Sequence, residues 1–504
     1  MEFSRTKKAK LNIIISLLSQ GVTLVCGLIV PRLMLTAFGS EANGAVTSIT
    51  QFLGYITFLE GGIGAVARSA LYKPLAEKDN LKISKVLNEV KHFFAIIGAV
   101  FTVYVLILAC TFTKISDIQC FNWIETFLLV IILSTSTFAQ YFIGITNSLL
   151  LQSAQKQYIS VGVSMAGNIL NTIAIVILIK FGCSLHIVKL VSAIVFTVKP
   201  VIYWAYVKKN YKLPKVKERE KTALEQKWEG LGQHIAYVLH SHTDVAVLTI
   251  FKSLSLVSVY SVYNMVAYNL QNIVSSFAIG NESVFGDMLA KKEMEKLRKT
   301  FGYYETLLSI VSVFFFSVAA ALITPFVKLY TAGITDADYY QPLFGVLLII
   351  SALIYGTRTP YATMVIAAGH FRQTKIAAYG EAVINIITSV ILVIKFGLIG
   401  VAIGTILAVL FRKLYYAFYL SKNIICIPIE FCIKRIIVNS FNFGLVYLIG
   451  AFYINKIEIV NFLDWIIAGV IIAICAGIIT LIMNIIFYRD DVAEIANKIV
   501  KKSK

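Results

Sequence analysis

Apolar segments long enough to cross a membrane alternate with short polar segments along the whole chain. A transmembrane helix needs about 20 apolar residues, and runs of this kind recur about fourteen times. The pattern predicts spans at residues 11–38, 43–72, 88–113, 123–152, 158–180, 185–207, 231–251, 255–289, 304–330, 342–369, 374–395, 398–420, 433–454 and 462–488. We therefore expect an all-α, polytopic membrane protein with about fourteen transmembrane helices.

The longest polar run, residues 208–221, separates two halves that resemble each other. The segment LTAFGS at 35–40 resembles LTIFKS at 248–253, and IKFG at 179–182 recurs at 394–397 at nearly the same offset. Two matches at one offset indicate a duplication. The duplication predicts that the first six helices superpose on the second six, and parallel repeats of this kind are a common transporter design.

The repeat sets the expected domain organisation. A first six-helix bundle is followed by a basic cytoplasmic hinge loop, a second six-helix bundle, and a last helix pair with a basic cytoplasmic tail. The boundaries expected for these four parts are 1–207, 208–228, 229–423 and 424–504.

Composition and charge support a membrane protein. Of the 504 residues, 58% are hydrophobic and only 14% are charged, whereas about a quarter of the residues in a soluble domain are charged. The formal net charge is +19, and most of the 46 Lys and Arg residues fall in alternate loops. This one-sided distribution predicts both termini in the cytoplasm and explains the charge without a nucleic-acid partner.

The chain shows no motif of an enzyme. No Walker A, H-E-x-x-H or G-x-S-x-G sequence occurs, and the seven cysteines form no C-x-x-C pair. The polar loops are too short to hold a catalytic domain. We therefore expect a non-enzymatic protein without a metal or other cofactor.

Ionisable residues within the predicted helices are the first candidate site residues, because each costs several kcal/mol at mid-bilayer unless it faces a cavity or a partner. Glu60 and Arg68 share one helical stripe. Arg32 follows Pro31 and could instead reach the interface. Arg358 lies more than about 15 Å from either end of its predicted span, so its side chain cannot reach either surface. It could contact an anionic substrate, or Glu381 could neutralise it.

Two further helices carry polar residues at helical spacing. His240 and Asp244 are four residues apart and are a candidate proton relay, or a packing contact. Tyr260, Asn264 and Tyr268 form a stripe that could bind a sugar, or a polar seam between helices. Glu381 is a further candidate for ion coupling.

Several segments resemble the bacterial polysaccharide transporters, the O-antigen-type flippases of the multidrug/oligosaccharidyl-lipid/polysaccharide (MATE-like) superfamily. The resemblance rests on Pro31-Arg32-Leu33, Phe38–Gly44, Glu60-Gly61-Gly62 and Ala367-Ala368-Gly369. Asn43 departs from the pattern, because the family often has an aromatic residue there. The resemblance implies two six-helix bundles around a central cavity, a role for Arg32, Arg68 and Arg358 in meeting a pyrophosphate, and contact of the last two helices with a lipid tail.

The resemblance leads to a functional hypothesis. We expect a flippase that moves a polyprenyl-pyrophosphate-linked oligosaccharide across the cell membrane for surface polysaccharide biosynthesis, by alternating access. Its partners would be this lipid-linked substrate, membrane lipid and other proteins of polysaccharide assembly. An ion-coupled drug or metabolite antiporter of the same superfamily is the alternative. An O-antigen polymerase or ligase would need a larger outer loop.

We predict that the hinge loop is cytoplasmic, because lysines are dense in it. A cysteine placed at Asn210 should therefore resist an impermeant thiol reagent in intact cells. Ready labelling at this position would overturn the orientation.

Overall fold

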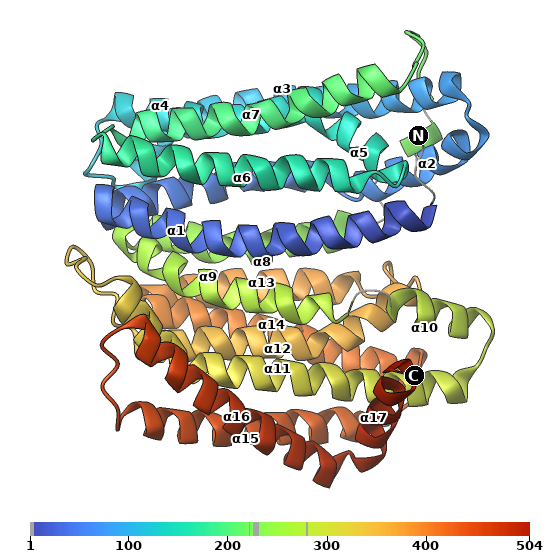
Figure 1. The fold of residues 1–504 in the computed structure, drawn as a ribbon, viewed down its shortest axis with the longest axis vertical. Helices are drawn as coiled ribbons and strands as arrows, with labels where there is room; N and C mark the ends of the chain where they lie inside the picture. Colours follow the sequence, from blue (N-terminus) through green and yellow to red (C-terminus); the bar gives the residue numbers. More distant parts are fainter. Residues whose placement is uncertain (1–4, 221, 225–230, 279–280, 504) are drawn as a thin grey trace. The chain divides into compact units, whose positions relative to one another are not determined.

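The computed structural model describes residues 5–220, 222–224, 231–278 and 281–503, and within these ranges it contains helices and no strand. The first elements are α1 Arg5–Gly54, η1 Tyr55–Glu60, α2 Ile63–Glu77, α3 Asn80–Ser116, α4 Trp123–Ala139, η2 Gln140–Gly144, α5 Ile145–Ser153, α6 Gln157–Lys180, α7 Leu185–Asn210 and α8 Leu231–Phe251. The following elements are α9 Leu254–Ser276, α10 Asn281–Ala290, α11 Met294–Tyr330, α12 Pro342–Ala367, α13 Lys375–Phe396, α14 Leu398–Asn423, α15 Ile429–Ile454, α16 Phe462–Phe487 and α17 Arg489–Ser503 (Figure 1). Each predicted span overlaps a helix, but the predicted span 255–289 is divided between two helices, α9 and α10.

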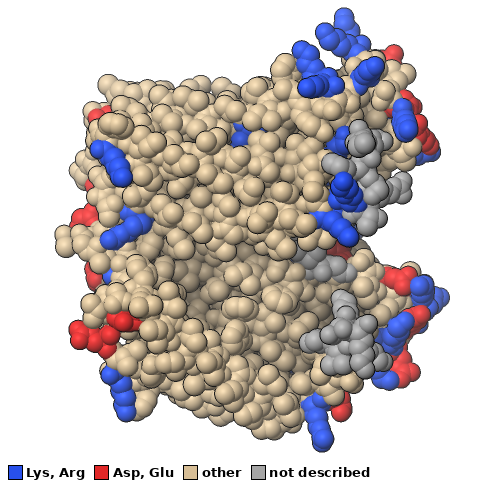
Figure 2. All heavy atoms as spheres, in the orientation of Figure 1, with Lys and Arg blue, Asp and Glu red and all other residues tan. Residues whose placement is uncertain are grey.

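The helices are those of a polytopic all-α membrane protein, as the sequence predicted. Among the described residues, 11 helices are long and apolar enough to cross a membrane. Large apolar side chains such as Leu448 and Phe452 of α15 are more than 60% exposed, which is the surface expected where lipid is the solvent. In each unit, charged side chains gather at the ends of the helices, and the surface between the ends is almost free of them (Figure 2).

Contacts divide the chain into two compact units, Met1–Ser258 and Val259–Lys504. The division falls within α9, because α8 packs against α1, η1 and α3 of the first unit. The sequence placed α8 in the second bundle, beyond the hinge loop. The four-part organisation predicted from the sequence rests on the internal repeat and not on contacts, so it stays a prediction.

Glycines lie at two breaks in this region: Gly39 falls between the predicted spans 11–38 and 43–72, where the sequence predicted a boundary, and Gly61 falls inside the second span. Gly39 has φ 81° and ψ 173°, so α1 consists of two helical limbs joined at this residue. The predicted span 43–72 is discontinuous: the second limb of α1 continues as the 3₁₀ helix η1, and Gly61 with φ 53° then separates η1 from α2. Both conformations favour glycine because a Cβ atom is unfavourable at positive φ.

The predicted repeat is visible in the order of helix packing. In the first unit α3 packs on α4, α4 on α7, and α6 on α7; in the second unit α11 packs on α12, α12 on α14, and α13 on α14. Within the matched IKFG segments, Gly182 follows the end of α6 with φ 70° and Gly397 follows the end of α13 with φ 55°. These similarities support the duplication, and the superposition of the two halves stays a prediction.

The last helices pack onto α11 of the second unit. Both α15 and α16 contact α11, as does α17, a short amphipathic helix that the sequence analysis treated as a basic tail. Thr306 of α11 donates a hydrogen bond to Asp491 of α17 (2.6 Å), and Arg435 of α15 lies 3.4 Å from the same carboxylate. These contacts fix the start of α17 on the bundle.

The α13–α14 hairpin depends on a glycine at its closest approach. A Cβ atom on Gly400 would lie 2.3 Å from the carbonyl oxygen of Leu392, a distance that real Cβ atoms do not show. Backbone atoms on both sides leave no flexible side chain that could move away. Gly400 therefore allows the two helices to pack in direct contact.

We predict that Gly400→Ala destabilises the protein by about 1–3 kcal/mol, because the added methyl overpacks the hairpin. Gly444→Ala is the matched control, because nothing lies within 4 Å of the Cβ position on this α15 glycine. The measurement is the thermal unfolding midpoint of the purified protein in detergent. Equal midpoints for the two variants would contradict the prediction.

Candidate functional site

A buried ion cluster joins three helices of the second unit. Arg358 of α12 donates from Nη1 to Oε1 of Glu381 on α13 at 2.8 Å, and Arg412 of α14 bonds the second oxygen of the same carboxylate. The Glu381 side chain is 1% exposed and the Arg358 side chain 8%. The guanidinium of Arg412 also donates to the hydroxyl of Tyr416, one turn further along α14, at 3.0 Å. One carboxylate thus holds two arginines.

A third cation lies beside this cluster. Lys413 is 5% exposed, and its Nζ donates to Thr357 Oγ1, next to Arg358, at 2.9 Å. Lys413 is also close enough to Glu305 and Arg435 to interact with their charges, so it links this cluster to a second one. In the described part of the second unit, the two clusters together bring four cations, Arg358, Arg412, Lys413 and Arg435, against three carboxylates, Glu381, Glu305 and Asp491. Removing a charge from water is costly unless it is paired, so an excess of buried cations favours a site that an anion can enter.

A second buried cluster balances its charges more closely. Arg435 of α15 lies 3.3 Å from Glu305 of α11 and 3.4 Å from Asp491 of α17. Tyr361 of α12 donates a hydrogen bond to Glu305. With Lys413 beside Glu305, this cluster has two cations and two carboxylates, and it is suited to holding α15 and α17 on the bundle.

In the first unit, Glu60 and Arg68 each face the broken helix α4–η2–α5. The Tyr141 hydroxyl donates to Glu60 Oε1 at 2.7 Å, and Arg68 Nη1 donates to Gln152 Oε1 at 3.1 Å. Tyr141 belongs to η2, a π-helical turn of five residues, and π turns commonly occur at functional positions. The expectation that Glu60 and Arg68 share one helical stripe is wrong, because the break at Gly61 places Glu60 at the end of η1 and Arg68 in α2. The two residues have separate partners on the same broken helix.

Two histidines of α8 contact η1 and the second limb of α1. The imidazole of His234 lies 2.7 Å from the carbonyl oxygen of Thr57, and His242 is hydrogen-bonded to Gln51. Asp244 is buried, at 4% exposure. The side chain of His240 lies outside the described residues, so the expected relay between His240 and Asp244 stays a prediction.

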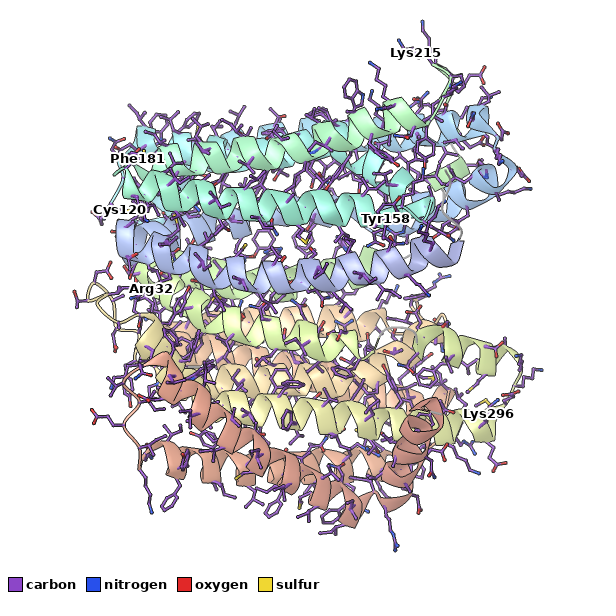
Figure 3. All side chains as sticks on the ribbon, in the orientation of Figure 1. Arg32, Cys120, Tyr158, Phe181, Lys215 and Lys296 are labelled. Atoms are coloured by element: carbon purple, nitrogen blue, oxygen red, sulfur yellow. The ribbon has the colours of Figure 1, made fainter. Side chains whose placement is uncertain are left out.

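The stripe on α9 does not present one uniform surface. Tyr260 is buried and its ring lies 5.9 Å from that of Phe344, whereas Asn264 is half-buried and Tyr268 is 53% exposed. Arg32 is half-buried near the end of the long limb of α1 (Figure 3). Binding of a sugar or a phosphate by these residues stays a prediction.

Asn43, the departure from the family pattern, has a packing role in the first unit. Its side chain is 7% exposed and donates to Ser258 at the start of α9 (2.8 Å). The hydroxyls of Ser48 on α1 and Thr249 on α8 are also hydrogen-bonded to each other, at 2.7 Å. Hydrogen bonds of this kind hold helices together inside a membrane.

Three buried cations were not recognised from the sequence. Arg412, Lys413 and Arg435 were counted among the basic loop residues that set orientation. The position of Arg412 and Lys413 well inside the predicted span 398–420 was the available signal for the first two. The partner of Arg358, in contrast, was named correctly as one of two alternatives, because the structure pairs it with Glu381.

Comparisons with known proteins identify the fold. No family model and no curated protein matches the sequence. The lipid II flippase MurJ, in an inward closed conformation, matches with a TM-score of 0.70 and 19% identity over 96% of this chain and 99% of that chain. An inward-facing multidrug resistance MATE family transporter of the MOP superfamily matches with a TM-score of 0.60 and 15% identity, covering 79% and 94% of the two chains.

A MOP superfamily transporter from Pyrococcus furiosus matches with a TM-score of 0.55 and 15% identity, covering 82% of this chain and 95% of that chain. At these identities the likeness shows a shared fold. The chain has the fold of the MurJ flippase and the MATE transporters, which is the fold that the resemblance in the sequence implied.

We predict that Glu381→Gln strongly destabilises the protein, by about 3–5 kcal/mol, because two buried guanidiniums lose the carboxylate they share. Glu295→Gln is the control, since Glu295 pairs with Lys299 at the surface and both side chains are more than 75% exposed; exposed pairs contribute little. The measurement is the thermal unfolding midpoint of each variant in detergent. A Glu381→Gln midpoint equal to that of the control would show that the cluster is not held by this carboxylate.

Proposed function

We propose that this protein is a flippase that moves a polyprenyl-pyrophosphate-linked oligosaccharide across the cell membrane for surface polysaccharide biosynthesis, by alternating access. The observation that carries the proposal is the excess of buried cations in the second unit: Arg358, Arg412, Lys413 and Arg435 against the carboxylates of Glu381, Glu305 and Asp491. The fold shared with a lipid II flippase supports the same class of substrate. Both termini would lie in the cytoplasm.

The chemistry of the substrate suits this cluster. A pyrophosphate head and its sugars cannot cross hydrocarbon unaided, because they would lose water without replacement. Arginine offers two parallel N–H donors to a phosphate, and such charge-assisted bonds are strong. Since Glu381 already occupies both guanidiniums, the substrate phosphate would have to compete with this carboxylate, so binding and release would be coupled to rearrangement of α12, α13 and α14.

A groove between α15 and α16 suits the lipid tail. A cavity of about 480 Å³ is open to the surface there. Its lining is apolar apart from the residues at one end, and it comprises Glu430, Ile433, Lys434, Ile437, Val438, Phe441, Met483 and Phe487. An isoprenoid chain could lie along this surface while the polar head moves through the protein.

An ion-coupled drug or metabolite antiporter is the second candidate. The observation that favours it is the pair of largely buried carboxylates in the first unit, Glu60 and Asp244, which could exchange a proton or bind a cation. The fold likeness to MATE transporters is compatible with either function. The two proposals differ in which unit carries the substrate-binding charges.

We predict that Arg358→Ala abolishes export of surface polysaccharide while the protein still reaches the membrane. Arg358→Lys should restore export only in part, because lysine keeps the charge and can still pair with Glu381 but lacks the guanidinium fork. The measurement is surface polysaccharide in a strain that lacks the native gene, with the protein level checked in the membrane fraction.

Lys299→Ala is the control for loss of a positive charge, since the Lys299 side chain is 78% exposed in the same unit; it should export normally. The variant Arg358→Ala/Glu381→Ala tests the purely structural alternative, in which removing both charges is tolerated. Full export by Arg358→Ala or by this double variant would overturn the role of Arg358. If Arg358→Ala lowers the amount of protein in the membrane, the export measured for Arg358→Lys decides whether Arg358 has the proposed role.

A further inference from the structure

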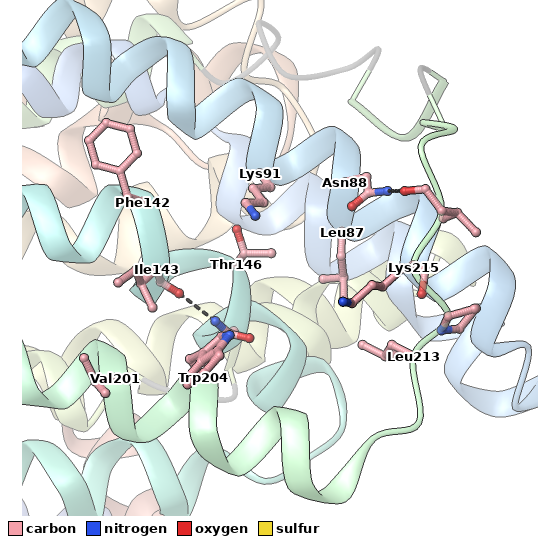
Figure 4. A pocket seen from close by; sticks show the side chains of 14 residues that line it. Leu87, Asn88, Lys91, Phe142, Ile143, Thr146, Val201, Trp204, Leu213 and Lys215 are labelled. Carbon is pink, nitrogen blue, oxygen red and sulfur yellow. Dashed lines mark hydrogen bonds between the residues drawn. The ribbon is translucent and has the colours of Figure 1, made fainter.

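A second feature belongs to the first unit, whereas the buried ion clusters belong to the second. A cavity of about 660 Å³ opens between α3, the η2–α5 segment, the last turns of α7 and the loop 211–220 (Figure 4). The loop is held over it by Asn88 of α3, whose Nδ2 donates to the carbonyl oxygen of Val216 at 2.6 Å. Lys85 of α3 is also paired with Glu218 of the loop. The loop is therefore a fixed wall of the cavity.

Two lysines enter this cavity from different elements. Lys91 comes from α3 and points toward Thr146, and Lys215 extends from the loop toward Trp204 (Figure 4). Over the described residues, neither ammonium group has an ion pair or a hydrogen bond, and no acidic side chain lines the cavity. Two ammonium groups without a neighbouring carboxylate favour an anion between them.

The cavity is also lined by a buried hydroxyl group, that of Ser84. Ser84 of α3 is 5% exposed and lines the cavity, and in the described part of the chain its Oγ has no hydrogen-bond partner. A buried hydroxyl without a partner costs free energy, so a ligand or water oxygen at this position would be stabilising. The cavity thus combines two cations and a hydroxyl with an unmet hydrogen-bonding requirement.

The side of the cavity opposite the loop is apolar and exposed. Phe142 and Ile143 of η2 and Val201 of α7 are 46%, 36% and 42% exposed, and they lie on helices of membrane-crossing length. Trp204, one turn from Val201, is 46% exposed at the edge of the cavity. Tryptophan favours the boundary between headgroups and acyl chains. A ligand here would meet cations at one end and exposed apolar side chains at the other.

We propose that this cavity binds an anionic phospholipid, with its phosphate between Lys91 and Lys215 and the start of an acyl chain along Phe142 and Val201. A free phosphate compound would leave the apolar side unused, which is why we assign a lipid. The site is separate from the buried cations of the second unit, so the proposal does not depend on the transported substrate. Bound lipid would fasten the loop 211–220 to the membrane surface.

Binding of phosphatidylglycerol to the full-length protein in detergent, measured by native mass spectrometry against phosphatidylcholine, tests the proposal. The variant Lys91→Ala/Lys215→Ala should lower the apparent affinity for phosphatidylglycerol about tenfold or more, since each lysine near an anionic headgroup contributes to binding. Both lysines are exposed, so the variant should fold normally. Phosphatidylcholine binding should not change.

The variant Lys209→Ala/Lys217→Ala is the matched control, because it removes the same charge from exposed positions that do not line the cavity. It should bind phosphatidylglycerol like the unaltered protein. Equal losses in both double variants would indicate diffuse electrostatic attraction and overturn the site. Displacement of the lipid by glycerol 3-phosphate at similar concentrations would overturn the assignment to a lipid.

Discussion

A charged side chain inside a membrane protein must find its partners within the protein, and Glu381 satisfies this requirement for two arginines at once. Because Arg358, Glu381 and Arg412 come from α12, α13 and α14, their bonds tie these three helices together, and Gly400 allows α13 and α14 to pack in direct contact. The same bonds make the bundle sensitive to any competing anion. The stability of the bundle and the binding of a substrate anion would therefore both depend on the carboxylate of Glu381.

The helices could be predicted from the sequence because lipid requires every backbone polar group to be bonded within its own segment, which makes long apolar runs helical. The break at Gly39 falls between the predicted spans 11–38 and 43–72, so it was predictable from the apolar pattern. The break at Gly61 falls inside the span 43–72, where the apolar pattern shows no boundary, and it depends on how the helix packs. The assignment of α8 by contacts to the first unit also depends on packing, since α8 and α1 are far apart in the sequence.

The candidate site could be predicted only in part, for a related reason. The depth of Arg358 within its span follows from residue counting alone, and Glu381 was the plausible carboxylate nearby. Arg412 lies 31 residues beyond Glu381, inside the predicted span 398–420, but it was counted with the basic residues that indicate orientation. Whether such a residue turns inward depends on which face of α14 packs against α13, and this is a property of the folded bundle.

The π turn η2 has a consequence for changes in the length of the chain. A π turn contains one residue more than the α-helical turn it replaces, while the helices on either side stay in phase. Loss of one residue within 140–144 could therefore be absorbed locally, with α4 and α5 left in place. The same loss elsewhere in these helices would turn every later side chain by about 100° about the axis, including Gln152, the partner of Arg68. Tolerance of deletions in this helix should be concentrated at a single turn.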